Sequence, residues 1–278
     1  MNYEDNPVSI KYYVKRYLQR NASRFAGHVV VDSPAGNGVS SRILADLGAT
    51  PMPFDLFPEY FTEAGMTCRR AEISEGIPLE DQSVDHVLCQ EGIEHFADQL
   101  QALREFNRII LPGGSLILTT PNYSNLRARL SYLLMESEKF NSAMPPNELD
   151  SIWMSDQSIT PEVYFGHIFL IGIQKLRVLA RLAGFRIRHI EFTRAKKTCV
   201  VLFPLMYPFI FVSSWLTWRK NRRKRGPESW PVYDEIYRLA VSPRLLVDGH
   251  LFVEFEREQD FRAVGAGLSS QHEGFNLT

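Results

Sequence analysis

The chain has few cysteines, almost no net charge and no visible export signal. Its three cysteines, Cys68, Cys89 and Cys199, are scattered among 278 residues, which excludes a disulfide framework and the paired spacing of a zinc site. A formal net charge of −1 argues against general affinity for nucleic acid. The first residues carry no basic segment followed by an apolar run. We therefore expect no secretory signal and a reducing, cytoplasmic compartment.

Apolar runs that alternate with helical periodicity predict an α/β fold. Val29–Val31 is an all-apolar run of the kind found in buried parallel strands. Apolar residues at helical spacing then predict a helix between Ile93 and Ile110. In total we expect strands at 29–31, up to Asp55, and at 67–73, 86–90, 115–119, 185–192 and 251–255. Such alternation predicts right-handed crossovers and a mostly parallel sheet covered on both faces.

The expected organisation places one core between an N-terminal helix and a flexible tail. Residues 1–27 form the amphipathic helix, 28–194 the core, 248–264 its final strand and 265–278 the tail. Within the core, 121–168 is irregular and long enough to be a lid or substrate wall. Residues 195–247 form an insertion before the last strand.

An acid followed by a glycine loop ends the first expected strand, in the run from Asp32 to Gly38. Gly36 and Gly38 permit a tight turn and close approach of a ligand, and Asp55 at the next strand end could accept hydrogen bonds from a ribose diol. A tight strand–helix turn without a ligand is the alternative. Asp32 disfavours a dinucleotide, because a like-charge contact with pyrophosphate at about 4 Å costs roughly 4 kcal/mol.

Three later features complete a recognisable pattern: Gln90 and Glu91 through His95, the turn Pro112–Gly114, and Glu72 with Ile73 at the expected end of strand three. In this order they resemble class I S-adenosylmethionine-dependent methyltransferases. Within that class they are similar to the small family that includes ubiquinone-biosynthesis O-methyltransferases and glycan-cluster methyltransferases. The resemblance covers about 28–122 and returns between Gly166 and Phe185.

The resemblance implies a Rossmann-like seven-stranded sheet with an antiparallel last strand, and S-adenosylmethionine as cofactor without a metal. It implies cofactor contacts from Asp32, Pro34, Ala35, Gly36, Gly38, Asp55, Glu72, Ile73 and Gln90. Pro34 stands where the family has its first glycine, which keeps a non-catalytic relative of the same fold under consideration.

Two histidines are candidate bases for an oxygen nucleophile. His95 follows strand four and His167 follows the lid-like segment, and imidazole suits proton removal near neutrality. Glu91 and Glu94 could orient His95, or they could simply favour a helix N-terminus. A structural His95 at a helix start, hydrogen-bonded to backbone, is the alternative and is favoured over the catalytic interpretation. Four residues could line an acceptor pocket or fill a core under the loop: Met135, Met144, Trp153 and Met154.

A charge-free stretch, Cys199–Trp218, is followed at once by the basic run Arg219–Arg225. Its length would permit a membrane span, but Pro204 and Pro208 interrupt it and the flanking strands belong to one sheet. An interfacial or re-entrant hairpin on an anionic membrane is expected instead. The alternative is an arm that packs on its own core or on a second copy. Binding of nucleic acid is disfavoured, because the aromatic and the basic residues form separate blocks along the sequence rather than alternating.

These observations predict O-methylation of a hydroxyl on a glycan, lipid-linked sugar or other amphiphile at the cytoplasmic membrane face. A quinone-precursor O-methyltransferase and a non-catalytic membrane scaffold are the two alternatives.

Overall fold

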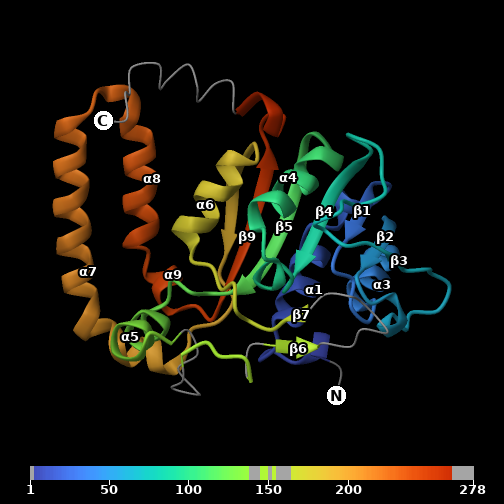
Figure 1. Ribbon diagram of the computed structural model, residues 1–278, viewed down its shortest axis with the longest axis horizontal. Helices are drawn as coiled ribbons and strands as arrows, with labels where there is room; N and C mark the ends of the chain where they lie inside the picture. The colour runs from blue at the N-terminus through green and yellow to red at the C-terminus, as the bar shows by residue number, and fades with distance from the viewer. Residues whose placement is uncertain (1–2, 138–144, 150–151, 155–163, 265–278) are drawn as a thin grey trace.

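The computed structural model describes residues 3–137, 145–149, 152–154 and 164–264. A seven-stranded sheet crosses the molecule in the order β3-β2-β1-β4-β5-β9-β8 (Figure 1). Its strands are β1 Val29–Asp32, β2 Thr50–Asp55, β3 Arg69–Arg70, β4 Val84–Gln90, β5 Ile110–Pro121, β8 Phe185–Glu191 and β9 His250–Arg257. Strand β9 runs antiparallel to both neighbours, β5 and β8. The predicted mostly parallel sheet with a reversed last strand is confirmed.

Helices cover both faces of this sheet. On one face, α1 Ile10–Arg20, α2 Ala22–Phe25 and α3 Val39–Asp46 pack on strand residues such as Val30 and Leu88. On the other face, α4 Gln99–Ile109 and α6 Ile173–Leu182 pack on Val31, Val87 and Phe255. Successive strand residues point to opposite faces, so the apolar runs fill two separate cores.

The N-terminal helix is joined to the last strand by buried polar contacts. The Tyr17 hydroxyl donates to Glu254 Oε2 at 2.6 Å, and the Arg24 guanidinium pairs with the same carboxylate. The bidentate pairing and the tyrosine bond hold the pKa of Glu254 below its usual value, against the opposing effect of burial. These contacts fix α1 against the sheet beside the glycine loop.

Two predicted elements have different bounds in the structure. The expected third strand, 67–73, is reduced to β3, so Glu72 and Ile73 lie in the turn beyond it. The expected helix from Ile93 begins with a short 3-10 helix, Ile93–His95, and α4 starts only after Asp98, whose side chain accepts from Gln101 N. Phe96 is in extended backbone, so the apolar periodicity alone extended the helix by too many residues.

The segment expected to be irregular contains regular structure. Helix α5, Leu126–Met135, begins with an Asn125 cap, and β6 Ile152–Met154 pairs with β7 Tyr164–Phe165. The expectation of an irregular 121–168 is wrong in these parts. Met135 ends α5, whereas Met144 and the side chains of Trp153 and Met154 lie outside the described residues.

The insertion between β8 and β9 is a helical hairpin. Helix α7, Lys197–Lys224, is followed by a 3-10 turn, Pro227–Ser229, and by α8 Trp230–Ala240 and α9 Pro243–Val247. Figure 1 shows α7 as the outermost layer, with α8 between it and α6. Pro204 and Pro208 do not break α7, so the expectation that they interrupt it is wrong. Its inner face packs on Leu126 and Leu246, which offsets the lost hydrogen bonds.

Candidate active site

A cavity of about 530 Å³ opens at the edge where the parallel strands end. Strand β1 contributes Asp32, and the loop after it contributes Pro34, Ala35 and Gly36. The remaining lining residues are Lys11, Asn37, Ser40, Asp55, Phe57, Tyr60, Gln90, Glu91, His95 and His167. Ligands of open α/β sheets bind at this position.

Asp55 is held in a fixed orientation by two backbone amides. Gly36 N donates to its Oδ2 at 2.8 Å, and Phe57 N donates to its Oδ1 at 2.9 Å. Each oxygen keeps a second lone pair, so the carboxylate can accept hydroxyl groups from the cavity side. This geometry fits a ribose diol, the ligand group that the sequence predicted for Asp55.

Asp32 lies on the cavity floor and is 1% exposed. The Ser41 hydroxyl donates to its Oδ2 at 2.6 Å. Burial raises the pKa of Asp32 to about 7, and the negative charge of Asp55 adds to the rise, while the Ser41 bond and Lys11 oppose it. A cationic ligand would relieve this effect by favouring the carboxylate form.

Pro34, which stands where the resemblance expects a glycine, packs against the backbone of Gly92. A Cβ on Gly92 would lie 2.3 Å from Pro34 Cδ and 3.2 Å from Cys89 Sγ. Gly92 therefore leaves room for the ring that replaces the family's first glycine. Gly38 caps α3 with a φ of 88°, a conformation that favours glycine, and a Cβ there would meet Phe61.

Gln90 and Glu91 end strand β4 beside the cavity. The Ser40 hydroxyl donates to Gln90 Oε1 at 2.9 Å. Glu91 has a φ of 51°, which is uncommon for a residue with a side chain and marks a constrained position. Burial, together with the nearby Glu94, raises the pKa of Glu91 well above its ordinary value.

Glu94, His95 and His167 form a compact cluster, in which the two histidines line the cavity and Glu94 is buried behind them. One potential ligand atom from each residue lies within 4.8 Å of the other two, and the two imidazole centroids are 5.2 Å apart. Thr120 Oγ1 donates to Glu94 Oε2 at 2.9 Å, and burial raises the pKa of Glu94 to about 7. The cluster can exchange protons near neutrality, and its donor set could also hold a divalent cation.

The Gln99 side chain connects the two segments that carry His95 and His167. Its amide donates to the carbonyls of Ile93 and Phe169, at 3.0 and 2.6 Å. The first carbonyl belongs to the turn that carries His95, and the second lies two residues after His167. The side chain therefore ties both segments to the start of α4.

Most predicted site residues line this cavity, but Gly38, Glu72 and Ile73 do not. Glu72 accepts from Ser74 Oγ, and Ile73 packs on the main core. Sequence reasoning missed the lining residues Lys11, Asn37, Ser40, Phe57 and Tyr60. Phe57 and Tyr60 lie in the loop that follows Asp55, so proximity along the chain could have indicated them. Lys11 lies on α1, and only tertiary packing brings it to the loop, where Nζ donates to Asn37 Oδ1 at 3.3 Å.

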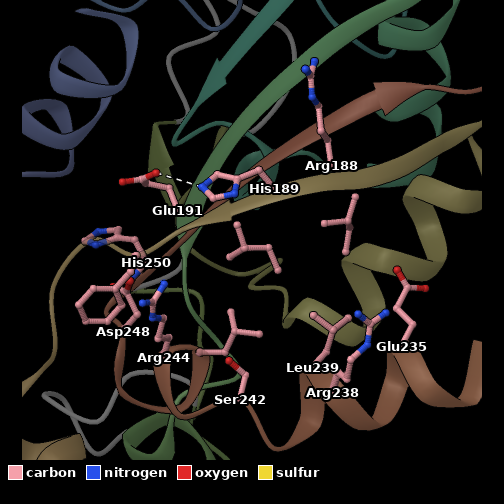
Figure 2. Close-up of a pocket in the computed structure, with 14 residues that line it drawn as sticks. Arg188, His189, Glu191, Glu235, Arg238, Leu239, Ser242, Arg244, Asp248 and His250 are labelled. Atoms are coloured by element: carbon pink, nitrogen blue, oxygen red, sulfur yellow. Dashed lines mark hydrogen bonds and ion pairs between the residues drawn. The ribbon is translucent and has the colours of Figure 1, made fainter. Parts of the chain in front are cut away.

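A second cavity of about 340 Å³ lies between β8, α8 and α9 (Figure 2). Charged groups occupy its walls, and several of them are already paired. His189 Nε2 lies 3.1 Å from Glu191 Oε2, and Glu235 pairs with Arg177 at 3.2 Å. His250 lines this cavity and reaches the first one, because its Nε2 lies 3.7 Å from Glu91 Oε2.

Residues 31–118 match the family model described as "Methyltransferase domain". A probable S-adenosylmethionine-dependent methyltransferase of Mycolicibacterium smegmatis is 32% identical over 118 residues, which are 40% of this chain and 46% of that protein. A ubiquinone biosynthesis O-methyltransferase of Methylococcus capsulatus is 31% identical over 160 residues, 51% of this chain and 66% of that protein. The chain thus spans about half to two thirds of these relatives.

Solved structures show the same fold at low identity. A SAM-dependent methyltransferase from Archaeoglobus fulgidus aligns with a TM-score of 0.52 at 14% identity, covering 91% of this chain and 97% of that chain. One from Mesorhizobium loti gives 0.52 at 14%, covering 92% and 100%. The chain therefore carries a methyltransferase domain of the class I, S-adenosylmethionine-dependent family.

Proposed function

We propose that the protein transfers a methyl group from S-adenosylmethionine to a hydroxyl oxygen. The observation that carries this proposal is the cavity at the sheet edge, where two acids and a glycine loop face two histidines. Asp32, Gly36 and Asp55 suit the donor, and His95 and His167 suit the acceptor. A cavity of about 530 Å³ is within the usual size of cofactor sites.

Different side chains would hold the ribose and the methionine end of the donor. Asp55 accepts the ribose hydroxyls, and Asp32 favours the positively charged methionine end. Lys11, which lines the same cavity, is suited to the methionine carboxylate. Phe57 and Tyr60 supply aromatic surface for the adenine.

Bound S-adenosylmethionine supplies an electrophilic methyl group on a sulfonium. The chain's own residues would align the acceptor hydroxyl, exclude water and take up its proton. His167 is the first candidate base and His95 the second. Glu91 and Glu94 would orient the imidazoles, and the buried Glu94 carboxyl can pass the proton onward near pH 7.

Calorimetry with S-adenosylmethionine and S-adenosylhomocysteine tests the donor site directly. We expect both to bind, and Asp55→Ala to weaken both by at least about tenfold through loss of charge-assisted hydrogen bonds. The alternative of a non-catalytic scaffold predicts binding of neither. That result would reject the enzyme proposal.

For the acceptor, we infer a hydroxyl on a glycan, a lipid-linked sugar or another amphiphile. The relatives named ubiquinone biosynthesis O-methyltransferase favour a second candidate, a quinone precursor. Tracing of labelled methyl groups into lipid, polysaccharide and quinone fractions separates the two. Label found only in the quinone fraction would identify a quinone precursor as the acceptor.

Helix α7 supports a position on the cytoplasmic membrane surface. It is long and apolar enough to cross a bilayer, and 6% of its most apolar 18-residue window is buried. A crossing is disfavoured, because α8 packs back along α7, with Trp218 Nε1 donating to Asp234 at 2.6 Å. A re-entrant loop is disfavoured too, since Arg222–Arg225 occupy the tip of the hairpin and would enter the hydrocarbon.

An interfacial orientation agrees best with the side chains of α7. Val201, Leu205 and Phe209 are 70%, 66% and 77% exposed, and they recur every four residues on one side of the helix. At its C-terminal end the Arg219 guanidinium lies over Trp215 and that of Arg222 over Trp218. Aromatic and basic groups together suit the headgroup region of an anionic membrane.

A further inference from the structure

The second cavity lies along an edge of the sheet. Among the strands that the structure describes, β8 is last in the order and pairs with β9 alone. Six consecutive residues, Ile187–Phe192, line the cavity. Side chains of a strand alternate between the two faces of a sheet, so a cavity that borders six residues in a row lies against the backbone edge. Figure 2 agrees, with β9 on one side of β8 and the cavity on the other.

The outward backbone groups of this edge are available for pairing. Within the described residues, the backbone of Ile187–Phe192 forms hydrogen bonds with β9 and with no other segment. An edge strand carries a row of unpaired N–H and C=O groups on its open side, and such a row is a template for another chain. The cavity therefore occupies the position at which a further strand would join the sheet.

The opposite wall of the cavity is one side of a helix. Glu235, Arg238 and Leu239 are three and four residues apart on α8, so they lie on the same side, and Ser242 and Leu245 continue this wall into α9. We call the space between this wall and β8 the β8 groove. Because helices close its far side, the groove admits one extended segment and excludes the edge of a whole second sheet.

Two arginines of the β8 groove have no acidic partner among the described residues. Arg238 and Arg244 both line the groove, and no described carboxylate lies within 4.0 Å of either guanidinium. Figure 2 shows them at opposite ends of the groove. A third arginine, Arg188, differs from them, because it pairs with Glu254 at 3.3 Å.

The carboxylates of the groove are engaged elsewhere. There are three of them among the lining residues: Glu191, Glu235 and Asp248. The first two pair with arginines outside the groove, at 2.7 and 3.2 Å. Asp248 is 2% exposed, and its two oxygens accept from the backbone N of Thr193 at 2.6 Å and of His250 at 3.2 Å. The charges of the two unpaired arginines are thus left for a ligand.

We propose that the β8 groove binds an extended acidic segment of a partner protein, which adds a strand to the edge of β8. The backbone edge selects a polypeptide, because another extended chain carries N–H and C=O groups at the same repeat of about 3.3 Å. The two arginines select acidic side chains. Six lining residues correspond to about 20 Å of strand, which a segment of about six residues would match. This inference is independent of the proposed methyl transfer.

Phage-displayed peptides of random sequence, panned on the full-length protein, supply the probe. We expect enriched sequences that combine β-branched with acidic residues, and the synthetic peptide should bind in calorimetry. Arg238→Gln with Arg244→Gln should weaken this binding at least about fivefold through loss of two exposed ion pairs. Arg223→Gln with Arg225→Gln removes the same charge from exposed residues at the hairpin tip and should leave binding unchanged. Melting temperatures monitor the fold of both double variants.

Two N-methylated versions of the peptide distinguish strand addition from docking of side chains alone. In an added strand, alternate N–H groups face β8 and the others point away. N-methylation of one alternate set should abolish binding, and N-methylation of the other should retain it. Hydrogen exchange should also become slower at backbone amides within Ile187–Phe192 when the unmethylated peptide binds.

Several results would overturn the proposal. They are panning that yields no peptide for this groove, equal effects of the two N-methylated sets, or exchange within Ile187–Phe192 that the peptide does not slow. Slow exchange there in the free protein that is lost on removal of residues 265–278 would instead assign the groove to the chain's own tail. Protection that rises with protein concentration would assign it to a second copy, and either result would reject a partner protein.

Discussion

His250 Nε2 lies 3.7 Å from Glu91 Oε2, and the two residues line different cavities. Burial lowers the pKa of His250 to about 4 and raises that of Glu91. The imidazole of His250 is therefore neutral at pH 7, and the contact is not an ion pair. The two side chains meet across the end of β5, with His250 at the start of β9 and Glu91 directly after β4.

The base proposal predicts that His167→Ala lowers turnover far more than donor affinity. Loss of a general base costs about 10²- to 10⁴-fold in rate, whereas S-adenosylmethionine affinity should change by no more than about threefold. Single-turnover kinetics and calorimetry measure the two quantities. His95→Ala is the matched comparison on the facing imidazole. Equal losses in turnover and affinity, or no loss in either, would remove His167 from the base role.

Chelation distinguishes proton transfer from cation binding in the Glu94, His95 and His167 cluster. If the cluster acts through proton exchange, dialysis against EDTA should leave turnover unchanged. Turnover that falls on dialysis and returns with a divalent cation would contradict this expectation and assign a metal role to the three side chains.

Asp32 predicts a pH dependence of donor binding. Its pKa of about 7 in the donor-free protein means that a cationic donor binds best once the carboxyl is ionised. The affinity for S-adenosylmethionine should rise between pH 6 and 8, by at most tenfold per pH unit below the pKa. Calorimetry across this range checks the slope. Asp32→Asn should bind S-adenosylmethionine weakly, and its affinity should not change over this pH range.

The same residue should destabilise the donor-free protein at high pH. The folded state holds the proton of Asp32 up to about pH 7, whereas the unfolded state releases it near pH 4. The folded state thus binds more protons in this window, and stability falls as pH rises through it. Asp32→Asn should raise the melting temperature at pH 8 and leave it nearly unchanged at pH 4. A lower melting temperature of Asp32→Asn than of the wild type at pH 8 would show that other contacts compensate the cost of burying the Asp32 carboxylate.

Pro34 and Gly92 should behave as a coupled pair. Gly92→Ala would place a Cβ 2.3 Å from Pro34 Cδ, and such overpacking costs about 1–3 kcal/mol. Pro34→Ala removes the clashing ring atoms, so the double variant should recover much of that stability. Urea unfolding of the four proteins gives the coupling energy. Additive effects would mean that the contact is not what restricts this loop.

Local patterns in the sequence predicted the sheet better than they predicted the site. The apolar run Val29–Val31 identified β1, and Asp32 and Asp55 marked two strand ends that tertiary structure brings to one cavity. Lys11 could not be found in this way, because nothing local distinguishes a lysine that faces the loop from one in solvent. The convergence of His95 and His167 likewise depends on Gln99, which bonds carbonyls from two segments.

Errors in the helices have equally specific causes. The apolar spacing of Ile93 and Phe96 continued that of α4, and it masked the start signal at Asp98. Pro204 and Pro208 predicted an interruption that packing of the inner face of α7 prevents. In both cases a local propensity and a tertiary contact disagree, and the outcome depends on contacts that the sequence does not list.

The exposed side of α7 should govern membrane binding. Leu205→Glu with Phe209→Glu places two charges on its exposed apolar side, and should weaken binding to anionic vesicles at least tenfold, because buried apolar area is lost. Val178→Glu is the control, since it adds a charge to an exposed apolar residue on α6. Co-sedimentation with phosphatidylglycerol vesicles at low and high salt separates the apolar contribution from that of Arg219–Arg225, which salt screens. Wild-type protein that fails to bind at low salt would eliminate the membrane surface and leave the apolar side of α7 for contact with protein.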